Sequence, residues 1–539
     1  MKRLLLASLA AASIQAQAFD KNPYLSSSHW TSSHGNSWAS GATDQVVGPK
    51  TAAQLGSPSY LPLDVINITL LATPKYPDGR MTYWGSSARK VYKLRVDNGK
   101  LVKVDEEFKD GQFNFTVAKT PTSGAYTLLS FENVFYTVLG KTIYAYTDVT
   151  NSASSAIKLR NKVDLTSYLD AEDAFVALNM TYNGYIAFAT KRGKVGVIDR
   201  GLTTTPKIVT LRETDDTSSA ATNISNSIAT DRTGGIFVVT SKRMHRIQWD
   251  GSQLYVNNGV NGAWSTKYEA DPTLCKTGNG GRLGEGSGTT PTIMGEGSQQ
   301  FVVINDCAKK NNLAMFWLGA IPNDWTAITG TTTDANGVQT TEVKDRRFAA
   351  QVPVDFGDGR SSIYSEQSPL AYGNGIVVVS NDYNNTGGIQ SAADLITPLL
   401  PANIKELASS VQNFATQLVS GRSLFQPWGI AKYEWNTATR KLEKKWSKLD
   451  VSCPNSIPTM SVQANTIYCV GAYNKEWTIE GINWTDGARA FRKNIASSVS
   501  LPIGENIKYN SFYSATEVAA DGGMIYGTLS GVAYLPPVK

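Results

Sequence analysis

Three glutamates stand at or just before short β-type segments in comparable parts of the chain. Glu285 precedes "GSGTTPTIM", Glu366 lies in "YSEQSPLAY" and Glu517 lies in "YSATEV". Carboxylates that share a pocket repel one another and lose hydration, so they need a cation, an arginine or a proton between them. We therefore take these three as the leading candidates for catalysis and for metal binding.

Three asparagines occupy similar positions and extend this candidate set. Asn226 precedes "SIATD", Asn455 precedes "SIPTMS" and Asn510 precedes "SFYSATEV". Together with the glutamates they would form an all-oxygen ligand set, which suits a hard cation, Ca²⁺ first. Such a cation can orient a cofactor or polarise a substrate oxygen. The alternative is that these side chains only cap strand ends and hydrate a channel.

Other catalytic patterns are sparse. The chain has three histidines, His29, His34 and His245, which argues against a His-rich metal centre or a His-based hydrolase. There is no G-x-S-x-G, the motif of the α/β-hydrolase nucleophile. The Asn-Asp pairs at Asn305 and Asn381 follow second strands of hairpins, and we predict turns there because both residue types hydrogen-bond their own backbone.

The elements that must position these residues are recurring hairpins of short apolar strands. The units begin near Tyr126, Phe175, Asn226, Thr290, Ser368, Ile457 and Ser514, with a weaker one from Asn67. Many short antiparallel strands at such a period predict an all-β fold, a single β-propeller of about eight blades, with seven as the alternative and a sandwich as the rival fold. Because innermost strands surround one channel, polar residues at their starts are expected to converge.

The two ends of the chain are expected to meet in the propeller. The last unit ends after its third strand at "AYLPPVK", and closing a propeller with a strand from the N-terminal region removes open edges. We predict that 66–96 supplies this strand. The predicted organisation is a lead-in segment over 19–65 and a propeller over 66–539.

The first residues, "MKRLLLASLAAASIQAQAFD", predict a signal peptide over 1–18. A basic start, a short apolar run and the A-x-A site at Ala16–Ala18 are typical of such segments. We therefore expect a periplasmic or secreted protein with no transmembrane segment. In an exported chain, Cys275, Cys307, Cys453 and Cys469 indicate two disulfides. Three connectivities are open, and we choose the sequence-local one, Cys275–Cys307 and Cys453–Cys469.

Charge and one helical segment bear on possible partners. The net charge of +6 is spread along the chain without a Lys/Arg cluster, so we expect no nucleic-acid partner. Ile404, Leu407, Val411, Phe414 and Leu418 share one face of a predicted helix, within an insertion at about 394–421. This helix, over 402–420, either packs on the propeller or serves as a lid or a docking element for a protein partner.

The repeated hairpins and the N-terminal "HWTSSHGNSWASGATDQVVGP", from His29 to Pro49, resemble the bacterial exported quinoprotein-like propellers. This resemblance implies a propeller with a site in its central channel and a quinone cofactor. The chain lacks the adjacent cysteine pair and the tryptophan-docking motif of the quinone-dependent alcohol dehydrogenases. These two departures speak against pyrroloquinoline quinone itself.

The resulting hypothesis is an exported propeller enzyme that acts on a small molecule in the central channel, assisted by a Ca²⁺-like cation. Hydrolase and oxidoreductase chemistry both remain open. The alternative is a non-catalytic periplasmic or secreted module for binding or assembly.

Overall fold

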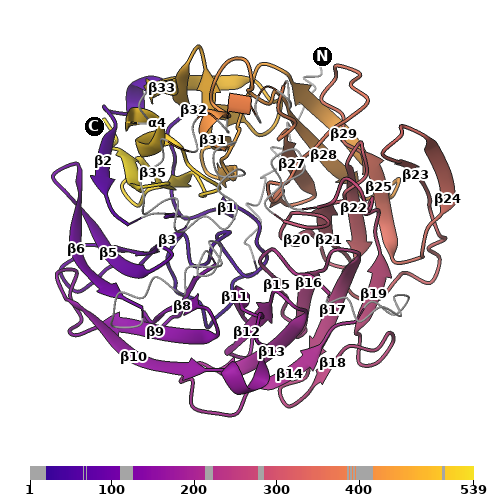
Figure 1. Ribbon diagram of the computed structural model, residues 1–539, viewed down its shortest axis with the longest axis horizontal. Coiled ribbons are helices and arrows are strands. Elements are labelled where there is room, and N and C mark those ends of the chain that lie inside the picture. Colours follow the sequence, from indigo (N-terminus) through magenta and orange to yellow (C-terminus); the bar gives the residue numbers. More distant parts are fainter. Residues whose placement is uncertain are drawn as a thin grey trace, which may run out of the picture.

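The computed structural model describes residues 20–538, except 65, 68, 110–125, 213–221, 277–283, 385–387, 389–390, 393–394, 396–397, 399–416 and 500–503. Eight antiparallel sheets surround one axis in the order of the sequence (Figure 1). The predicted eight-bladed β-propeller is therefore confirmed. The described part of the chain contains no helix long and apolar enough to cross a membrane.

The first four blades run from the innermost to the outermost strand in chain order. Their strands are β3 (Thr69–Ala72), β4 (Tyr83–Ser86), β5 (Lys90–Asp97) and β6 (Lys100–Phe108) in blade 1; β7 (Leu128–Leu129), β8 (Phe135–Leu139), β9 (Thr142–Asp148) and β10 (Ile157–Asp164) in blade 2; β11 (Phe175–Met180), β12 (Tyr185–Thr190), β13 (Lys194–Asp199) and β14 (Lys207–Thr210) in blade 3; and β15 (Ala229–Thr230), β16 (Gly235–Val239), β17 (Arg243–Trp249), β18 (Leu254–Tyr255) and β19 (Trp264–Lys267) in blade 4, where β18 and β19 both pair with β17.

The other four blades follow the same plan, with additions at blades 5, 7 and 8. Their strands are β20 (Thr292–Glu296), β21 (Gln299–Asn305), β22 (Asn312–Trp317) and β25 (Phe348–Pro353) in blade 5; β26 (Leu370–Tyr372), β27 (Gly375–Val379), β28 (Ile430–Asn436) and β29 (Lys441–Lys448) in blade 6; β30 (Thr459–Ser461), β31 (Thr466–Tyr473), β32 (Glu476–Asn483) and β33 (Arg489–Ser497) in blade 7, with β1 (Ala42–Thr43) parallel to β30; and β34 (Glu517–Val518), β35 (Met524–Thr528), β36 (Gly531–Leu535) and β2 (Ser59–Pro62) in blade 8. A separate hairpin, β23 (Thr329–Thr333) and β24 (Gln339–Val343), is inserted between β22 and β25, and the short helices are η1 (Ala52–Gln54), η3 (Thr166–Tyr168) and α4 (Gly504–Tyr509).

Large buried side chains from neighbouring blades form the core. Trp84 of blade 1 stacks on Phe135 of blade 2 at 5.5 Å between ring centroids, and Phe301 of blade 5 lies 4.7 Å from Trp435 of blade 6. Aromatic pairs of this kind contribute about 0.5–1.5 kcal/mol beyond the area that they bury. Because each blade buries its faces against its neighbours, the ring can exceed the usual size of a single core.

The ring closes through a strand that differs from the predicted one. β2 pairs antiparallel with β36 and forms the outer edge of blade 8. The predicted segment, 66–96, instead starts blade 1 as β3 to β5. The last blade does end at its third strand, as expected, but its fourth strand comes from within the predicted lead-in segment. The pairing of β2 with β36 is continuous, from Ser59 opposite Tyr534 to Pro62 opposite Gly531.

Residues 20–48, which we call the hub segment, cross the centre of the ring (Figure 1). The hub segment makes hydrogen bonds with the inner strand of every blade. In six blades a hub carbonyl accepts from an inner-strand N–H at 2.8–3.0 Å; the pairs are Trp30 with Ala72, Thr31 with Leu129, Ser37 with Thr230, Trp38 with Ile293, Ser40 with Ala371 and Gly41 with Met460. In blade 3 the Asn22 amide donates to the Met180 carbonyl at 2.8 Å. In blade 8 the His29 ring contacts the backbone of Val518.

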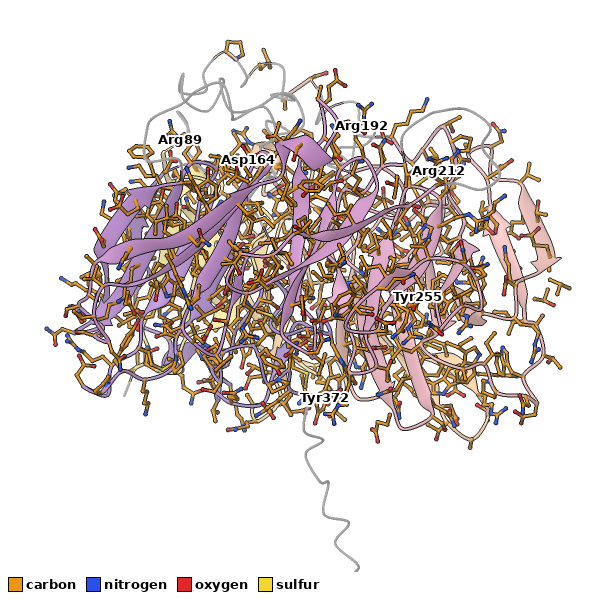
Figure 2. The ribbon with its side chains drawn as sticks, turned by 90° about the horizontal axis from the view of Figure 1, so that it is seen from below. Arg89, Asp164, Arg192, Arg212, Tyr255 and Tyr372 are labelled. Carbon is orange, nitrogen blue, oxygen red and sulfur yellow. A yellow bond between two sulfur atoms is a disulfide. The ribbon has the colours of Figure 1, made fainter. Side chains whose placement is uncertain are left out.

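The hub segment lies toward one face of the ring. Figure 2 shows the two faces, with Arg89, Asp164, Arg192 and Arg212 at the upper one and Tyr372 at the lower one. Asp164 ends β10, where the link to blade 3 begins, and Arg212 lies in the link between blades 3 and 4. Tyr372 instead ends β26, just before the turn between a first and a second strand. In blades 1 to 4 the hub segment bonds the last residue of the inner strand, the end that leads to the lower face. The links that enter each inner strand lie at the upper face.

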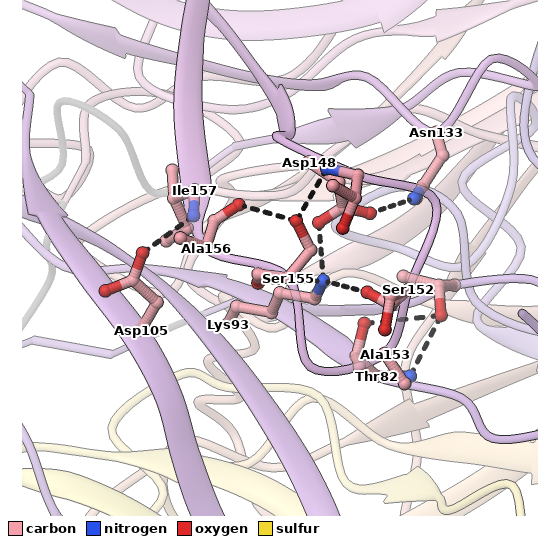
Figure 3. A network of polar contacts seen from close by, with 12 residues as sticks. Thr82, Lys93, Asp105, Asn133, Asp148, Ser152, Ala153, Ser155, Ala156 and Ile157 are labelled. Atoms are coloured by element: carbon pink, nitrogen blue, oxygen red, sulfur yellow. Dashed lines mark hydrogen bonds and ion pairs between the residues drawn. The ribbon is translucent and has the colours of Figure 1, made fainter.

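A buried ion pair joins blades 1 and 2 (Figure 3). Lys93 of β5 donates to Asp148 of β9 at 2.5 Å, and Tyr76 and Asn133 donate to the other oxygen of the same carboxylate at 2.6 and 2.9 Å. Burial lowers the pKa of Lys93 and raises the pKa of Asp148 despite this pairing. Desolvation therefore outweighs the mutual attraction of the pair, as is common for buried ion pairs.

Both predicted disulfides are present, Cys275–Cys307 and Cys453–Cys469. The predicted signal peptide lies outside the described residues. Most of the predicted helix 402–420 also does, but Gln417 to Val419 are helical and pack at the upper face beside blade 7.

Candidate functional site

Glu366 lies in the link that enters β26, and a neighbouring strand end fixes its backbone. The side-chain oxygen of Asn381, just after β27, accepts from the N–H of Glu366 at 2.9 Å and from that of Gln367 at 3.2 Å. The Asn381 amide nitrogen donates to the carbonyl of Pro454 at 3.0 Å. One buried amide thus ties the Glu366 link to the adjacent link of blade 7.

The carboxylate of Glu366 is surrounded by donors. The N–H of Gly284 lies 2.9 Å from one oxygen, and the phenols of Tyr364 and Tyr513 donate to the other, the latter at 3.3 Å. Glu366 is 5% exposed, while Tyr364 and Tyr513 are partly exposed. The two tyrosines therefore separate the carboxylate from solvent on the upper face.

Tyr513 has an unusual backbone and a network that supports it. Its φ is 62° and that of Phe512 is 41°, a left-handed conformation that few non-glycine residues adopt. Gln417 donates to the Tyr513 phenol at 3.4 Å and accepts from Tyr383 at 2.7 Å. Burial first, and then the neighbouring Glu366, raise the pKa of Tyr513 well above its usual value, so Tyr513 remains a neutral donor. Strained residues of this kind concentrate at functional sites.

The structure brings Asn455 and Asn510 together. The Asn455 amide donates to Asn510 and to the Gln417 carbonyl, both at 2.8 Å, and its oxygen accepts from Tyr383 at 3.2 Å. Asn510 also donates to the Gln417 carbonyl, at 3.0 Å. Both asparagines are buried. They hold the tyrosines and Gln417 in place beside Glu366.

Glu285 and Asn226 lie on the other side of Gly284. Glu285 accepts from Asn223 at 2.5 Å. With its amide oriented so that both groups have partners, Asn226 donates to the carbonyl of Gly288 at 3.1 Å and accepts from the N–H of Thr289 at 3.3 Å. Glu285 therefore follows directly after Gly284, which holds Glu366, but the Glu285 carboxylate contacts Asn223 in a different link. Asn226 pins the link between blades 4 and 5.

Glu517 is placed differently from the other two glutamates. It is the first residue of β34, where it pairs with Ile525, whose side chain belongs to the core between blades 8 and 1. Glu517 is 1% exposed, and neither carboxyl oxygen has a hydrogen-bond partner among the described residues. Burial raises the pKa of Glu517 well above its usual value. The described contacts therefore do not gather the three glutamates around one point.

A resident cation was part of the prediction, and the donor set tests it. Within the described ranges, no group of three His, Cys, Asp or Glu side chains could hold a metal ion. One oxygen of Glu366 already accepts from Gly284, and the other accepts from two phenols. Among the described residues, the contacts of Glu366 are therefore those of a hydrogen-bonded carboxylate rather than of a calcium-type ligand set. The chemistry proposed below uses neither a cation nor a quinone.

The Asn-Asp pairs after second strands serve as pins between blades. Asp306 accepts from the backbone and side chain of Asn312 at 2.7 and 2.6 Å, a closed turn contact. Burial raises the pKa of Asp306 to about 7. Asn305 donates to Ser365 at 3.0 Å, in the link that carries Glu366. The predicted closed contact is thus present at Asp306, whereas Asn381 and Asp382 lie in irregular chain without a turn. Both asparagines reach across to a neighbouring link, Asn305 to Ser365 and Asn381 to Pro454.

The two disulfides anchor links that form the site. The carbonyl of Cys275 accepts from Gly286 at 3.1 Å, two residues after Gly284. The carbonyl of Cys453 accepts from Gln367 at 3.0 Å, one residue after Glu366. The disulfides therefore stabilise the bases of the segments that deliver Gly284 and Asn455.

The histidines of the hub segment are buried and neutral. His34 lies 3.0 Å from the hydroxyl of Thr290, and burial lowers the pKa of His34 to about 4. Burial also lowers the pKa of His29 to about 4, opposed in part by its bond to Val518. His245, in β17, is buried as well, and its pKa falls to about 3. These three histidines are core residues of the fold.

A hollow opens on the lower face. It measures about 690 Å³, and its lining includes Asp20 and Trp38 of the hub segment, Glu296 and Tyr372. None of its lining residues belongs to the Glu366 site. The hub segment thus lines the hollow of the lower face, whereas the contacts of Glu366 come from links at the upper face.

Comparison with known proteins places the chain in a family. A protein of Archaeoglobus fulgidus, described as uncharacterized, is 34% identical over 517 residues, which cover 95% of this chain and 88% of the archaeal one. The chain belongs to the family of this archaeal protein. No family model matches the chain.

Two solved structures share the fold of this chain at low sequence identity. The quinohemoprotein alcohol dehydrogenase from Comamonas testosteroni superposes with a TM-score of 0.53 and 10% identity, covering 94% of this chain and 80% of that one. A europium-containing methanol dehydrogenase gives 0.50 and 9%, covering 94% and 90%. These likenesses confirm a quinoprotein-like propeller fold.

Sequence reasoning found Glu366 but missed the residues that surround it. Tyr364 and Tyr383 come from blade 6, Tyr513 from the link to blade 8 and Gln417 from the insertion, so no local pattern joins them. A signal existed for Tyr364 alone, which stands two residues before Glu366.

Proposed function

We propose that the protein is an exported propeller enzyme that acts on a small polar molecule at the upper face, with Glu366 as general base. The observation that carries this proposal is the Glu366 carboxylate, almost buried and held by Gly284, Tyr364 and Tyr513. A base must be fixed within hydrogen-bonding reach of its proton, and the Asn381 contact supplies that rigidity.

The proposed chemistry is a proton transfer at a substrate hydroxyl or an attacking water. Glu366 takes the proton, and the phenols of Tyr364 and Tyr513, which donate to Glu366 in the free protein, turn their O–H groups to the oxygen on which charge develops. Positioned acid–base groups contribute about 10²–10⁴-fold to a rate. Hydrolysis of a lactone and oxidation of an alcohol can both begin in this way, and the oxidation also needs an external electron acceptor.

Export is part of the proposal and has independent support. Disulfides persist in oxidising compartments and are rare in the cytosol of most organisms. Both cysteine pairs of this chain are disulfide-bonded. The quinoprotein-like fold agrees with a periplasmic or secreted location, which fractionation of the native host would test.

A substrate screen with matched variants tests the enzyme proposal. Wild type, Glu366→Gln and Glu285→Gln would be assayed for lactone hydrolysis by proton release and for alcohol oxidation with a dye as electron acceptor. We expect turnover that falls by about 10²-fold or more in Glu366→Gln and is largely retained in Glu285→Gln, because only the first change removes the base. Equal turnover in all three proteins would contradict the role of Glu366.

Thermal-shift measurements with the same compounds separate the enzyme from the alternative, a non-catalytic binding module. A compound that stabilises wild type but not Glu366→Gln, without being converted, would support binding alone. A compound that stabilises both proteins equally would place its site elsewhere.

A further inference from the structure

The hairpin β23–β24 stands outside the eight blades. It is inserted between β22 and β25 of blade 5 and forms a two-stranded sheet of its own. Figure 1 shows β24 as the outermost strand of that side, beyond β23. All five residues of β24, "QTTEV", are exposed, and Val343 is 72% exposed.

The register determines which backbone groups of β24 point outward. The N–H of Asp334 bonds the carbonyl of Val338 at 3.0 Å and closes the turn. Hydrogen-bonded and non-hydrogen-bonded pairs alternate along an antiparallel ladder, so Thr340 and Glu342 bond β23. The N–H and carbonyl groups of Gln339, Thr341 and Val343 therefore face away from β23.

The two outer edges of the hairpin differ. On the β23 side, the Lys309 N–H bonds the carbonyl of Thr333 at 2.9 Å and the Gln351 amide bonds that of Thr331 at 3.2 Å. On the β24 side, no hydrogen bond from any described residue reaches the outward backbone groups. Proteins usually protect such edges with charged side chains, Pro or a bulge; β24 has one charged residue, Glu342, and neither a Pro nor a bulge.

We propose that β24 pairs antiparallel with β24 of a second copy of this chain, about a twofold axis at Thr341. In this register Thr341 faces its own counterpart and Gln339 faces Val343, and each hydrogen-bonded pair exchanges two main-chain bonds. Thr340 then faces Glu342, so no like charges oppose each other. This self-complementarity favours a second copy over an unrelated strand, and the pairing joins two hairpins into one four-stranded sheet.

The proposed dimer is independent of the proposed function, since the hairpin lies outside the Glu366 site. A contact of one short strand buries little surface, so we expect a weak dimer whose fraction rises with protein concentration.

Sedimentation velocity of the full chain across a range of concentrations tests the pairing. Thr341→Pro removes an outward N–H without removing a main-chain bond of the hairpin. Thr341→Val is its matched control, because both changes also remove the hydroxyl contact of Thr341 with Thr331 at 3.1 Å. We expect wild type and Thr341→Val to dimerise and Thr341→Pro to stay monomeric with an unchanged thermal midpoint of the propeller. A wild type that stays monomeric throughout, or a Thr341→Pro protein that dimerises like wild type, would overturn the proposal.

A charge-swap experiment checks the twofold register directly. Thr341→Lys and Thr341→Glu each oppose like charges across the axis, so each alone should be monomeric. Mixing the two variants should restore a dimer, because the introduced lysine of one copy then faces the introduced glutamate of the other. Failure of the mixture to associate, with both variants folded by circular dichroism, would reject this register.

Discussion

The side-chain oxygen of Asn381 lies 2.9 Å from the backbone N–H of Glu366 and also accepts from Gln367. The same amide donates to Pro454, so a single buried side chain positions the carboxylate relative to blade 7. Glu366 therefore depends on a residue that touches no substrate in the proposed chemistry.

Replacement of this positioning residue should separate stability from function. Asn381→Ala leaves two N–H groups and one carbonyl without their partner, which costs about 1–3 kcal/mol for a buried group. We expect loss of stability together with loss of the Glu366-dependent activity or ligand shift. The measurements are chemical denaturation and the screen described above.

Asn305→Ala is the matched control for this change. Asn305 is also a buried asparagine at the end of a second strand, but it donates to Ser365 and leaves the Glu366 N–H untouched. Asn305→Ala should lower the free energy of unfolding by a comparable amount, and it should retain more of the Glu366-dependent activity than Asn381→Ala does. If both variants lost activity to the same extent, Asn381 would have only a structural role.

Glu517 predicts a pH-dependent stability. Its folded-state pKa is raised by burial above the ordinary value of about 4.3, so the folded form holds a proton that the unfolded chain releases. The stabilisation from the protonated Glu517 is complete below the ordinary pKa of about 4.3, and it is lost as the pH rises through the raised folded-state pKa. Glu517→Gln cannot ionise and should be more stable than wild type at neutral pH by on the order of 1–3 kcal/mol.

Denaturation curves from pH 5 to pH 9 would measure this effect, with Glu505→Gln as the control. Glu505 is an exposed glutamate of α4, and its replacement should leave the curve parallel to that of wild type. Parallel curves for Glu517→Gln and wild type would show that the carboxyl has a partner in solution that stabilises its charge.

The positions of Glu366 and Glu517 show what sequence can predict. Both stand near the start of an inner strand, and alternating strands with tight turns were enough to find the eight blades and those two starts. Glu366 lies in the link before β26, but Glu517 is already in β34, where its side chain leaves the sheet toward blade 1. Successive residues of a strand point to opposite sides of the sheet, so an error of one position moves a predicted channel residue between blades.

The hub segment shows what sequence does not predict. Its Ser, Gly and Asn residues have no strand or helix period, and they resemble an ordinary loop. They are buried because their backbone carbonyls meet unpaired N–H groups at the inner strands of successive blades. The closing strand was misplaced for a related reason, since β2 is short, partly exposed and follows the hub segment without a hairpin partner in sequence.

His34 predicts a loss of stability in acid. Its folded-state pKa of about 4 is below the ordinary value of about 6.5, because burial disfavours the charged ring. Stability is full above pH 6.5 and falls as the pH drops toward 4, by about 3 kcal/mol for this group at 1.36 kcal/mol for each pKa unit. The neutral variant His34→Gln should show a shallower fall, measured as thermal midpoint against pH. An identical slope would mean that His34 titrates normally.

Lys93 and Asp148 allow a test of how the blades are joined. Lys93→Met leaves Asp148 buried with only Tyr76 and Asn133 as donors, and breaking a buried pair in this way costs about 3–5 kcal/mol. Asp148→Asn leaves the Lys93 ammonium with the carbonyls of Ser152 and Ser155. Desolvation already outweighs attraction in this pair, so the double variant, which buries no charge, should be more stable than the sum of the single losses predicts. Thermal midpoints of the four proteins give the coupling energy, and additive losses would show that the two charges do not interact in the folded ring.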